Sequence, residues 1–164
     1  MVTLTEKHFQ NRLSLYKTYG LHPLMLNGGL GMVRNKALMK LGHEFEALVG
    51  EVLSKLFAEV QPHPHIDNCI PDFVIGETWY DAKLSRSTVF SPGCDTIDKY
   101  RKHTDYLVII YALHDTDSSD DRAKFVHINE LRPLVTPKIQ RKIDAFIRKA
   151  TEVRFGESNR LSDV

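Results

Sequence analysis

The chain has 164 residues, of which 42% are hydrophobic and 26% charged, a composition typical of one globular domain with a sizeable core. No apolar run approaches the length of a bilayer span, so the sequence predicts no membrane partner. The two cysteines are too few for a disulfide framework and the first residues lack a signal-peptide pattern, which together lead us to expect a cytoplasmic protein.

The net charge of +1 conceals an uneven distribution along the chain. Residues 1–40 hold six lysines and arginines against one glutamate, and residues 131–164 hold eight against four acids. Residues 41–83 hold eight acids against two lysines. An acidic centre between basic ends suits a polyanion bound at the edges and a cation bound in the middle, although chance clustering of solvated faces gives the same pattern.

The N-terminal third of the chain is predicted to contain two helices joined by a loop. Residues 6–19 have apolar side chains at helical spacing, and the glycine-rich stretch at 27–31 predicts a loop without the spacing of a phosphate-binding motif. From about residue 36 to 57, apolar residues recur every three or four positions, which predicts an amphipathic helix on a core. We treat residues 1–36 as a basic extension and residues 37–164 as the body of the same single domain.

A β-hairpin is predicted at about 66–84. Its two-residue turn is Gly76-Glu77, with glycine first, as a type II′ turn requires. Counting outward from this turn sets Asp72 opposite Asp81, with Cβ atoms about 4.5–5.5 Å apart on one face. Lys83 follows two residues later on the same face. Such an arrangement costs stability unless a proton or a cation lies between the carboxylates.

The second half of the chain alternates helices and strands. A loop at 85–95 and a short helix at about 96–103 lead to the apolar, β-branched run at 105–113, which predicts a strand buried on both faces. A further strand is predicted at 124–128. Thr136 and Pro137 then provide a cap and a first-turn proline for a last helix with a basic outer face. This order of elements predicts an α/β domain with a mixed sheet.

Opposed aspartates suit a divalent cation with oxygen ligands. Mg²⁺ is the usual occupant, because it needs only one or two carboxylates besides waters and substrate phosphate, and we expect Mn²⁺ to substitute. The backbone carbonyl of Ala82 offers a further oxygen. We expect the pKa of Lys83 to be lowered by desolvation and held up by the aspartates, and its ammonium to stabilise a pentavalent phosphate. With a cation-activated water, the combination predicts phosphodiester hydrolysis.

The segment Pro71-Asp72, followed after eight residues by Asp81-Ala82-Lys83, resembles the motif of the PD-(D/E)XK nuclease superfamily. This superfamily includes restriction and homing endonucleases and Holliday-junction resolvases. The resemblance implies a restriction-endonuclease-like core, in which a helix, a three-stranded meander, a second helix and a further strand follow one another. It also implies that the two aspartates bind metal and that the lysine is catalytic.

The resemblance spans about residues 38–113 and implies a glutamate on the first helix. The stretch from Gly42 to Glu46 matches the superfamily pattern at Glu46, which we therefore expect to bind metal and to act in catalysis. Glu44 is the rival, because a helical wheel sets both glutamates about 100° from the centre of the apolar stripe.

The expected partner is DNA, cut by a sequence-specific enzyme of the restriction or homing type that acts as a homodimer, one site per strand. The superfamily resemblance implies a prokaryotic or phage context. A structure-specific, resolvase-like nuclease and a non-catalytic DNA-binding module with a relic active site stay open as alternatives. The residues expected at DNA phosphates are Arg34, Lys36, Arg86, Lys99, Arg101 and Lys102.

Two histidines precede the hairpin. His63 and His65 could be combined with Cys69 and Cys94 into a zinc site, but the spacing matches no common zinc pattern. We therefore expect them to be loop histidines.

Overall fold

The computed structural model describes residues 28–162 of the chain, with side chains described for residues 36–156. The helix expected at 6–19 and most of the basic extension lie outside the described residues. The chain divides into two compact units, Met1–Lys40 and Leu41–Val164, and the architecture described below is that of the second unit. Within residues 28–162, no helix is long and apolar enough to cross a membrane.

The helices and strands follow a simple order along the chain. They are α2 (Gly28–Leu56), β1 (Gln61–Pro62), β2 (Phe73–Ile75), β3 (Thr78–Ser85), η1 (Arg86–Phe90), α3 (Thr96–Tyr100), β4 (Tyr106–Leu113), β5 (Lys124–His127), α4 (Ile128–Leu131), η2 (Arg132–Leu134) and α5 (Pro137–Ser162).

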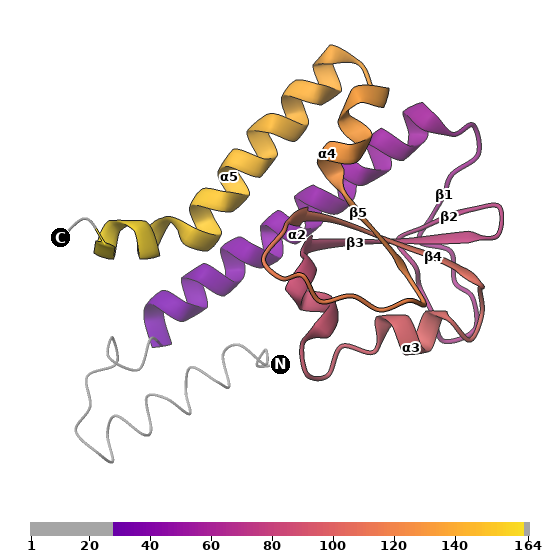
Figure 1. Cartoon of the computed structure of the whole chain (residues 1–164), viewed down its shortest axis with the longest axis horizontal. Helices are drawn as coiled ribbons and strands as arrows, with labels where there is room; N and C mark the ends of the chain where they lie inside the picture. The colour runs from indigo at the N-terminus through magenta and orange to yellow at the C-terminus, as the bar shows by residue number, and fades with distance from the viewer. Residues whose placement is uncertain (1–27, 163–164) are drawn as a thin grey trace. The chain divides into compact units, whose positions relative to one another are not determined.

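The five strands form one open mixed sheet in the order β1-β2-β3-β4-β5 (Figure 1). Strands β1, β2 and β3 form an antiparallel meander, whereas β4 is parallel to β3 and β5 is parallel to β4. The connection from β3 to β4 runs through η1 and α3, as parallel neighbours require a crossover. The predicted α/β class with a mixed sheet is therefore confirmed.

The predicted hairpin forms in the predicted register. Phe73 pairs with Tyr80, and the next two pairs lead inward to the turn. Gly76 has a φ of 60°, a value that L side chains rarely adopt. Among the described residues, the non-glycine residues with positive φ are His63 and Asp67, so Glu77 has negative φ. Positive φ at the first turn residue alone is the signature of a type II′ turn.

Helices cover both faces of the sheet (Figure 1). On one face, Val89 of η1 and Ile97 of α3 pack with sheet residues that include Trp79. On the other face lie α2 and α5, whose Phe45 and Phe146 rings stack with centroids 5.4 Å apart. The site lies where α2 passes the end of β2.

Several boundaries differ from the expectations: α3 ends at Tyr100 and not near residue 103, and the expected loop at 85–95 contains η1. α2 begins at Gly28, so residues 28–31 are helical and the expected loop is wrong. Gln61–Pro62, for which no strand was predicted, forms the edge strand β1, a position where proline is tolerated because its missing N–H faces outward. β5 ends at His127, whose imidazole accepts from the Asn129 N–H and caps α4.

Candidate functional site

Asp72 and Asp81 lie side by side, as the hairpin register requires. Asp72 directly precedes β2 and Asp81 lies in β3, one pair beyond the last ladder pair, Phe73 with Tyr80. The Ala82 N–H donates to Asp72 Oδ2 at 2.7 Å, which holds that carboxylate against β3.

The environment of the pair disfavours two negative charges. Burial raises the pKa of Asp72, the charges of Asp81 and Glu46 raise it further, and the Ala82 N–H opposes the shift. Burial also raises the pKa of Asp81, against the opposing effect of Lys83. Because two buried carboxyl groups that raise each other's cost of ionisation lie next to one another, a proton or a cation is needed between them.

Lys83 forms an ion pair with Asp81, with Nζ 3.2 Å from Oδ2. Burial acts to lower the pKa of Lys83, but Asp81 outweighs burial and the pKa is raised, so the ammonium stays charged. The contact lacks hydrogen-bond geometry, and within the described part of the chain Asp81 Oδ2 is buried without a hydrogen-bond partner. Asp81 is only 4% exposed, so the ion pair with Lys83 is the interaction that compensates its buried Oδ2.

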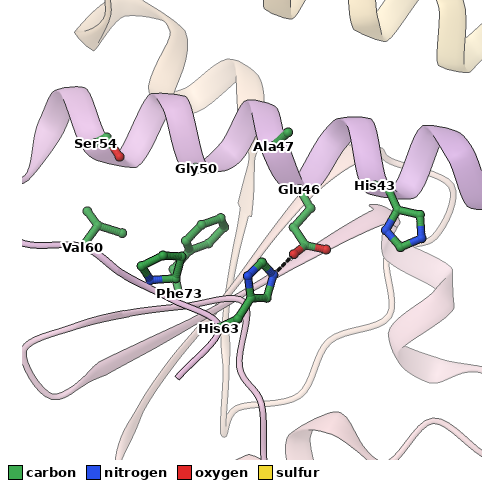
Figure 2. Close-up of a pocket in the computed structure, with 9 residues that line it drawn as sticks. His43, Glu46, Ala47, Gly50, Ser54, Val60, His63 and Phe73 are labelled. Carbon is green, nitrogen blue, oxygen red and sulfur yellow. Dashed lines mark hydrogen bonds and ion pairs between the residues drawn. The ribbon is translucent and has the colours of Figure 1, made fainter. Parts of the chain in front are cut away.

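Glu46 reaches the site from α2. Its Oε1 contacts the Nε2 of His63, and one ligand atom each from Glu46, His63 and Asp72 lies within 4.8 Å of the others (Figure 2). The rival Glu44 is drawn away, because it pairs with Lys149 of α5 at 3.0 Å. The structure therefore places Glu46, and not Glu44, beside the aspartates.

His63 is the site residue that the sequence expectations missed. It follows β1, and its backbone N–H donates to the Asp72 carbonyl at 2.9 Å, which continues the β1–β2 ladder to the aspartate. The sequence carries no clear signal for this position, because the long connection from β1 to β2 does not fix which of their residues pair. The zinc grouping considered for this segment does not form, since the histidine joins Glu46 and Asp72 instead of cysteines.

A cavity of about 420 Å³ opens beside this cluster (Figure 2). Glu46 and His63 form one part of its wall, and Ala47, Gly50 and Phe73 form an apolar part. Gly50 is required here, since a Cβ at this position would approach the Phe73 ring to 2.9 Å. The cavity gives a ligand access to Glu46 and His63, whereas neither aspartate is part of its wall.

The Ala82 backbone is oriented toward the same carboxylates. Its N–H points at Asp72. Because the N–H and C=O of one strand residue point to the same side, its carbonyl faces that edge too. The expected carbonyl ligand thus lies on the side of the site.

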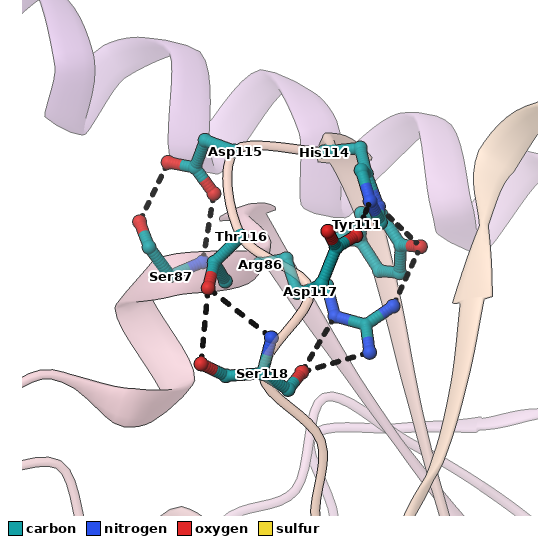
Figure 3. Close-up of polar contacts among 8 residues, drawn as sticks. All are labelled: Arg86, Ser87, Tyr111, His114, Asp115, Thr116, Asp117 and Ser118. Carbon is teal, nitrogen blue, oxygen red and sulfur yellow. Dashed lines mark hydrogen bonds and ion pairs between the residues drawn. The ribbon is translucent and has the colours of Figure 1, made fainter.

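The six residues expected at DNA phosphates have different surroundings. Arg86 is half-buried, and its guanidinium donates to the Ser118 carbonyl and to the Tyr111 hydroxyl (Figure 3). The guanidinium also lies over the Phe125 ring. Arg101 donates to the Thr104 carbonyl. Lys36 and Lys102 are exposed, and Lys99 is half-buried. The side chain of Arg34 lies outside the described residues.

The donor set fits a divalent cation. Glu46 and Asp72 offer oxygens and His63 offers a nitrogen, and the buried Asp81 carboxylate behind them is paired with Lys83. The carboxylates of Asp72, Asp81 and Glu46 repel one another, and a bound cation would relieve this repulsion. The site therefore has two parts joined by the Asp72–Asp81 contact, a ligand cluster and an aspartate–lysine ion pair.

Neither a family model, nor a curated protein, nor a solved structure matches this chain. The geometry of the site is therefore what points to a function.

Proposed function

We propose that this protein is a Mg²⁺- or Mn²⁺-dependent endodeoxyribonuclease of the PD-(D/E)XK kind, which hydrolyses phosphodiester bonds. The observation that carries the proposal is the convergence of three carboxylates and one ammonium from α2 and the hairpin, at Glu46, Asp72, Asp81 and Lys83. The element order supports it, because a helix, an antiparallel meander, a helix and a strand parallel to the third meander strand follow one another.

Each side chain has a task in that reaction. Glu46 and Asp72 would hold the cation, with Asp81 and the Ala82 carbonyl as further oxygen donors. When bound, the cation supplies Lewis-acid chemistry, neutralising phosphate charge and making a water nucleophilic near neutral pH. The Lys83 ammonium, charged and held 3.2 Å from Asp81, is the donor that would stabilise negative charge developing on the phosphate oxygens.

The decisive experiment is digestion of supercoiled plasmid with Mg²⁺, with Mn²⁺ and with chelator. We expect nicked and linear products with either cation and none with chelator. Lys83→Met is expected to abolish cleavage while a gel shift shows that DNA binding persists. The control is Lys55→Met, which changes an exposed lysine of α2 and should cut at the wild-type rate. Cleavage by Lys83→Met at the wild-type rate would overturn the proposal.

The form of the products separates the variants of the proposal. Discrete fragments indicate a sequence-specific enzyme of the restriction or homing type, whereas cutting of branched substrates alone indicates a resolvase-like enzyme. A protein that binds plasmid and cuts none of these substrates with either cation is a DNA-binding module with a relic site.

A homodimer is the assembly that we propose for double-strand cleavage, since one site cuts one strand and a two-fold arrangement supplies the second. Light scattering of the protein on a DNA duplex that it cleaves should give the mass of two chains. One chain per duplex would contradict the dimer and leave the hydrolytic proposal intact.

A further inference from the structure

The contact between His63 and Glu46 constrains what can lie at the site. An imidazole nitrogen without a proton and a carboxylate oxygen both present lone pairs, so direct approach of the two atoms repels. The observed contact of Nε2 with Oε1 therefore requires a proton on the ring or a cation in its place. Asp72 completes the group, with ligand atoms of all three residues within 4.8 Å of one another.

The backbone, and not burial, brings the imidazole to this position. The His63 side chain is 53% exposed, yet its N–H is bonded to the Asp72 carbonyl and its ring lies 6.1 Å from the Phe73 ring. Its φ of 46° is uncommon for a residue other than glycine. Ladder, ring contact and backbone conformation together present the imidazole to the carboxylates.

A nitrogen ligand changes which cation the site prefers. Mg²⁺ takes oxygen ligands and keeps most of its waters. Imidazole binds first-row transition metals well, in an order that rises from Mn²⁺ toward Cu²⁺. One imidazole with two carboxylates is therefore a mixed donor set that gains affinity for transition metals over Mg²⁺.

We propose that His63 is a direct metal ligand, and that the site formed with Glu46 and Asp72 binds a first-row transition-metal ion in preference to Mg²⁺. This inference rests on the proposed function in its choice of site, but metal binding is measurable without any substrate. The nuclease proposal allows either Mg²⁺ or Mn²⁺, and the ligand role of His63 favours a transition-metal ion such as Mn²⁺.

Mn²⁺ is the probe, because its electron paramagnetic resonance reports both affinity and ligand type. Wild-type protein is expected to bind Mn²⁺ at least tenfold more tightly than Mg²⁺, with pulsed spectra that show coupling to an imidazole nitrogen. His63→Asn removes the imidazole and keeps a residue that tolerates positive φ. It is expected to lose the nitrogen coupling and to weaken Mn²⁺ binding about 10–100-fold, while Mg²⁺ binding changes less.

The matched control is His65→Asn, two residues along the same segment and exposed. It should keep wild-type Mn²⁺ affinity and nitrogen coupling. Circular dichroism of both variants checks that they fold. Equal affinity of folded His63→Asn and wild type for Mn²⁺, or wild-type spectra without nitrogen coupling, would overturn the inference.

The outcomes also separate this inference from the nuclease proposal. Nitrogen coupling in a protein that cuts no DNA supports the metal site and overturns the nuclease. Cleavage that proceeds as fast with Mg²⁺ as with Mn²⁺, and that His63→Asn leaves unchanged, supports the nuclease and overturns the ligand role of His63.

Discussion

At the residue scale, the partner from another element decides which of Glu44 and Glu46 lies at the candidate metal site. Both lie on α2, at similar distance from its apolar stripe. Lys149 of α5 pairs with Glu44, and His63 contacts Glu46. A helical wheel contains neither partner, because both come from other elements. The assignment of Glu46 to the metal cluster therefore depends on tertiary structure.

Glu46→Gln is expected to lower metal-dependent cleavage about 10–100-fold, because the amide is a poorer metal ligand than the carboxylate. Glu44→Gln is the matched control and should keep the wild-type rate. It loses an exposed ion pair, which costs about 1 kcal/mol or less. Initial rates of plasmid cleavage measure the effect, and equal losses in the two variants would contradict the assignment.

The paired aspartates predict that the site destabilises the metal-free protein. In the unfolded chain both titrate near pH 4, whereas in the folded protein their pKa values are raised, Asp72 chiefly by burial and then by Asp81. Above pH 4 the folded state therefore binds more protons than the unfolded state. Stability falls as the pH rises through this window, until the raised folded values are passed.

Asp72→Asn removes one of the two repelling charges. In chelator at pH 7.5 we expect its unfolding free energy to exceed that of the wild type by about 1 kcal/mol or more, with a smaller gain at pH 5. Urea denaturation at the two pH values measures the difference. Asp105→Asn, at a side chain that is 91% exposed, is the control and should leave stability unchanged. A less stable Asp72→Asn at pH 7.5 would contradict the argument.

At the scale of the element, the hairpin depends on one backbone conformation. Gly76 carries φ 60° in open space, since a Cβ added at this position would meet nothing within 4 Å. The requirement for glycine is therefore conformational and not steric. The same hairpin sets Asp72 opposite Asp81, so the turn residue controls the geometry of the site.

Gly76→Ala is expected to destabilise the protein by about 1–2 kcal/mol, because alanine is strained at positive φ. Gly42→Ala is the matched control, since Gly42 lies in α2 with equally open space and without positive φ. Alanine there should stabilise the protein by about 0.5–1 kcal/mol. Thermal or urea unfolding of both variants tests the prediction, which fails if the two changes have the same sign.

At the scale of the whole folded unit, α2 is held from two sides. Gly50 lies against Phe73 of the sheet, and Phe45 stacks on Phe146 of α5. Phe45 is fully buried and Phe146 is 8% exposed. The helix that carries Glu46 is therefore clamped between the sheet and α5, which fixes the distance from α2 to the aspartates.

Phe146→Ala is expected to cost about 3–5 kcal/mol of unfolding free energy, because it opens a cavity against Phe45. Lys142→Ala, on the same helix, removes only an exposed ion pair with Glu51 and should cost about 1 kcal/mol or less. Denaturant unfolding followed by circular dichroism measures both. A cost for Phe146→Ala as small as that for Lys142→Ala would contradict the packing role of α5.

The sequence predicts local features of this fold well. The hairpin register follows from turn chemistry at Gly76 and from strand periodicity, and the start of α5 at Pro137 follows from its cap and first-turn proline. These features are decided by neighbours in the chain, and so are readable from it.

Features decided by distant neighbours were not predicted. β1 contains a proline and exists only because it pairs with β2, and the position of His63 follows from that pairing. Residues 28–31 are helical despite three glycines, against their low intrinsic propensity. The partners of Arg86, which are Tyr111, Ser118 and Phe125, also come from distant parts of the chain, and its expected role at DNA stays a prediction.

The two parts of the site assemble from contacts of different range. Asp72 and Asp81 belong to one hairpin, a unit that forms in about 1–10 μs in isolation. The Glu46–His63 contact joins residues 17 positions apart and needs α2 and β1 docked in place. The carboxylate repulsion is thus contained within the hairpin, whereas the complete ligand set is present only in the docked structure. A bound cation should accordingly slow unfolding far more than it speeds folding, and so increase the kinetic stability of the folded protein.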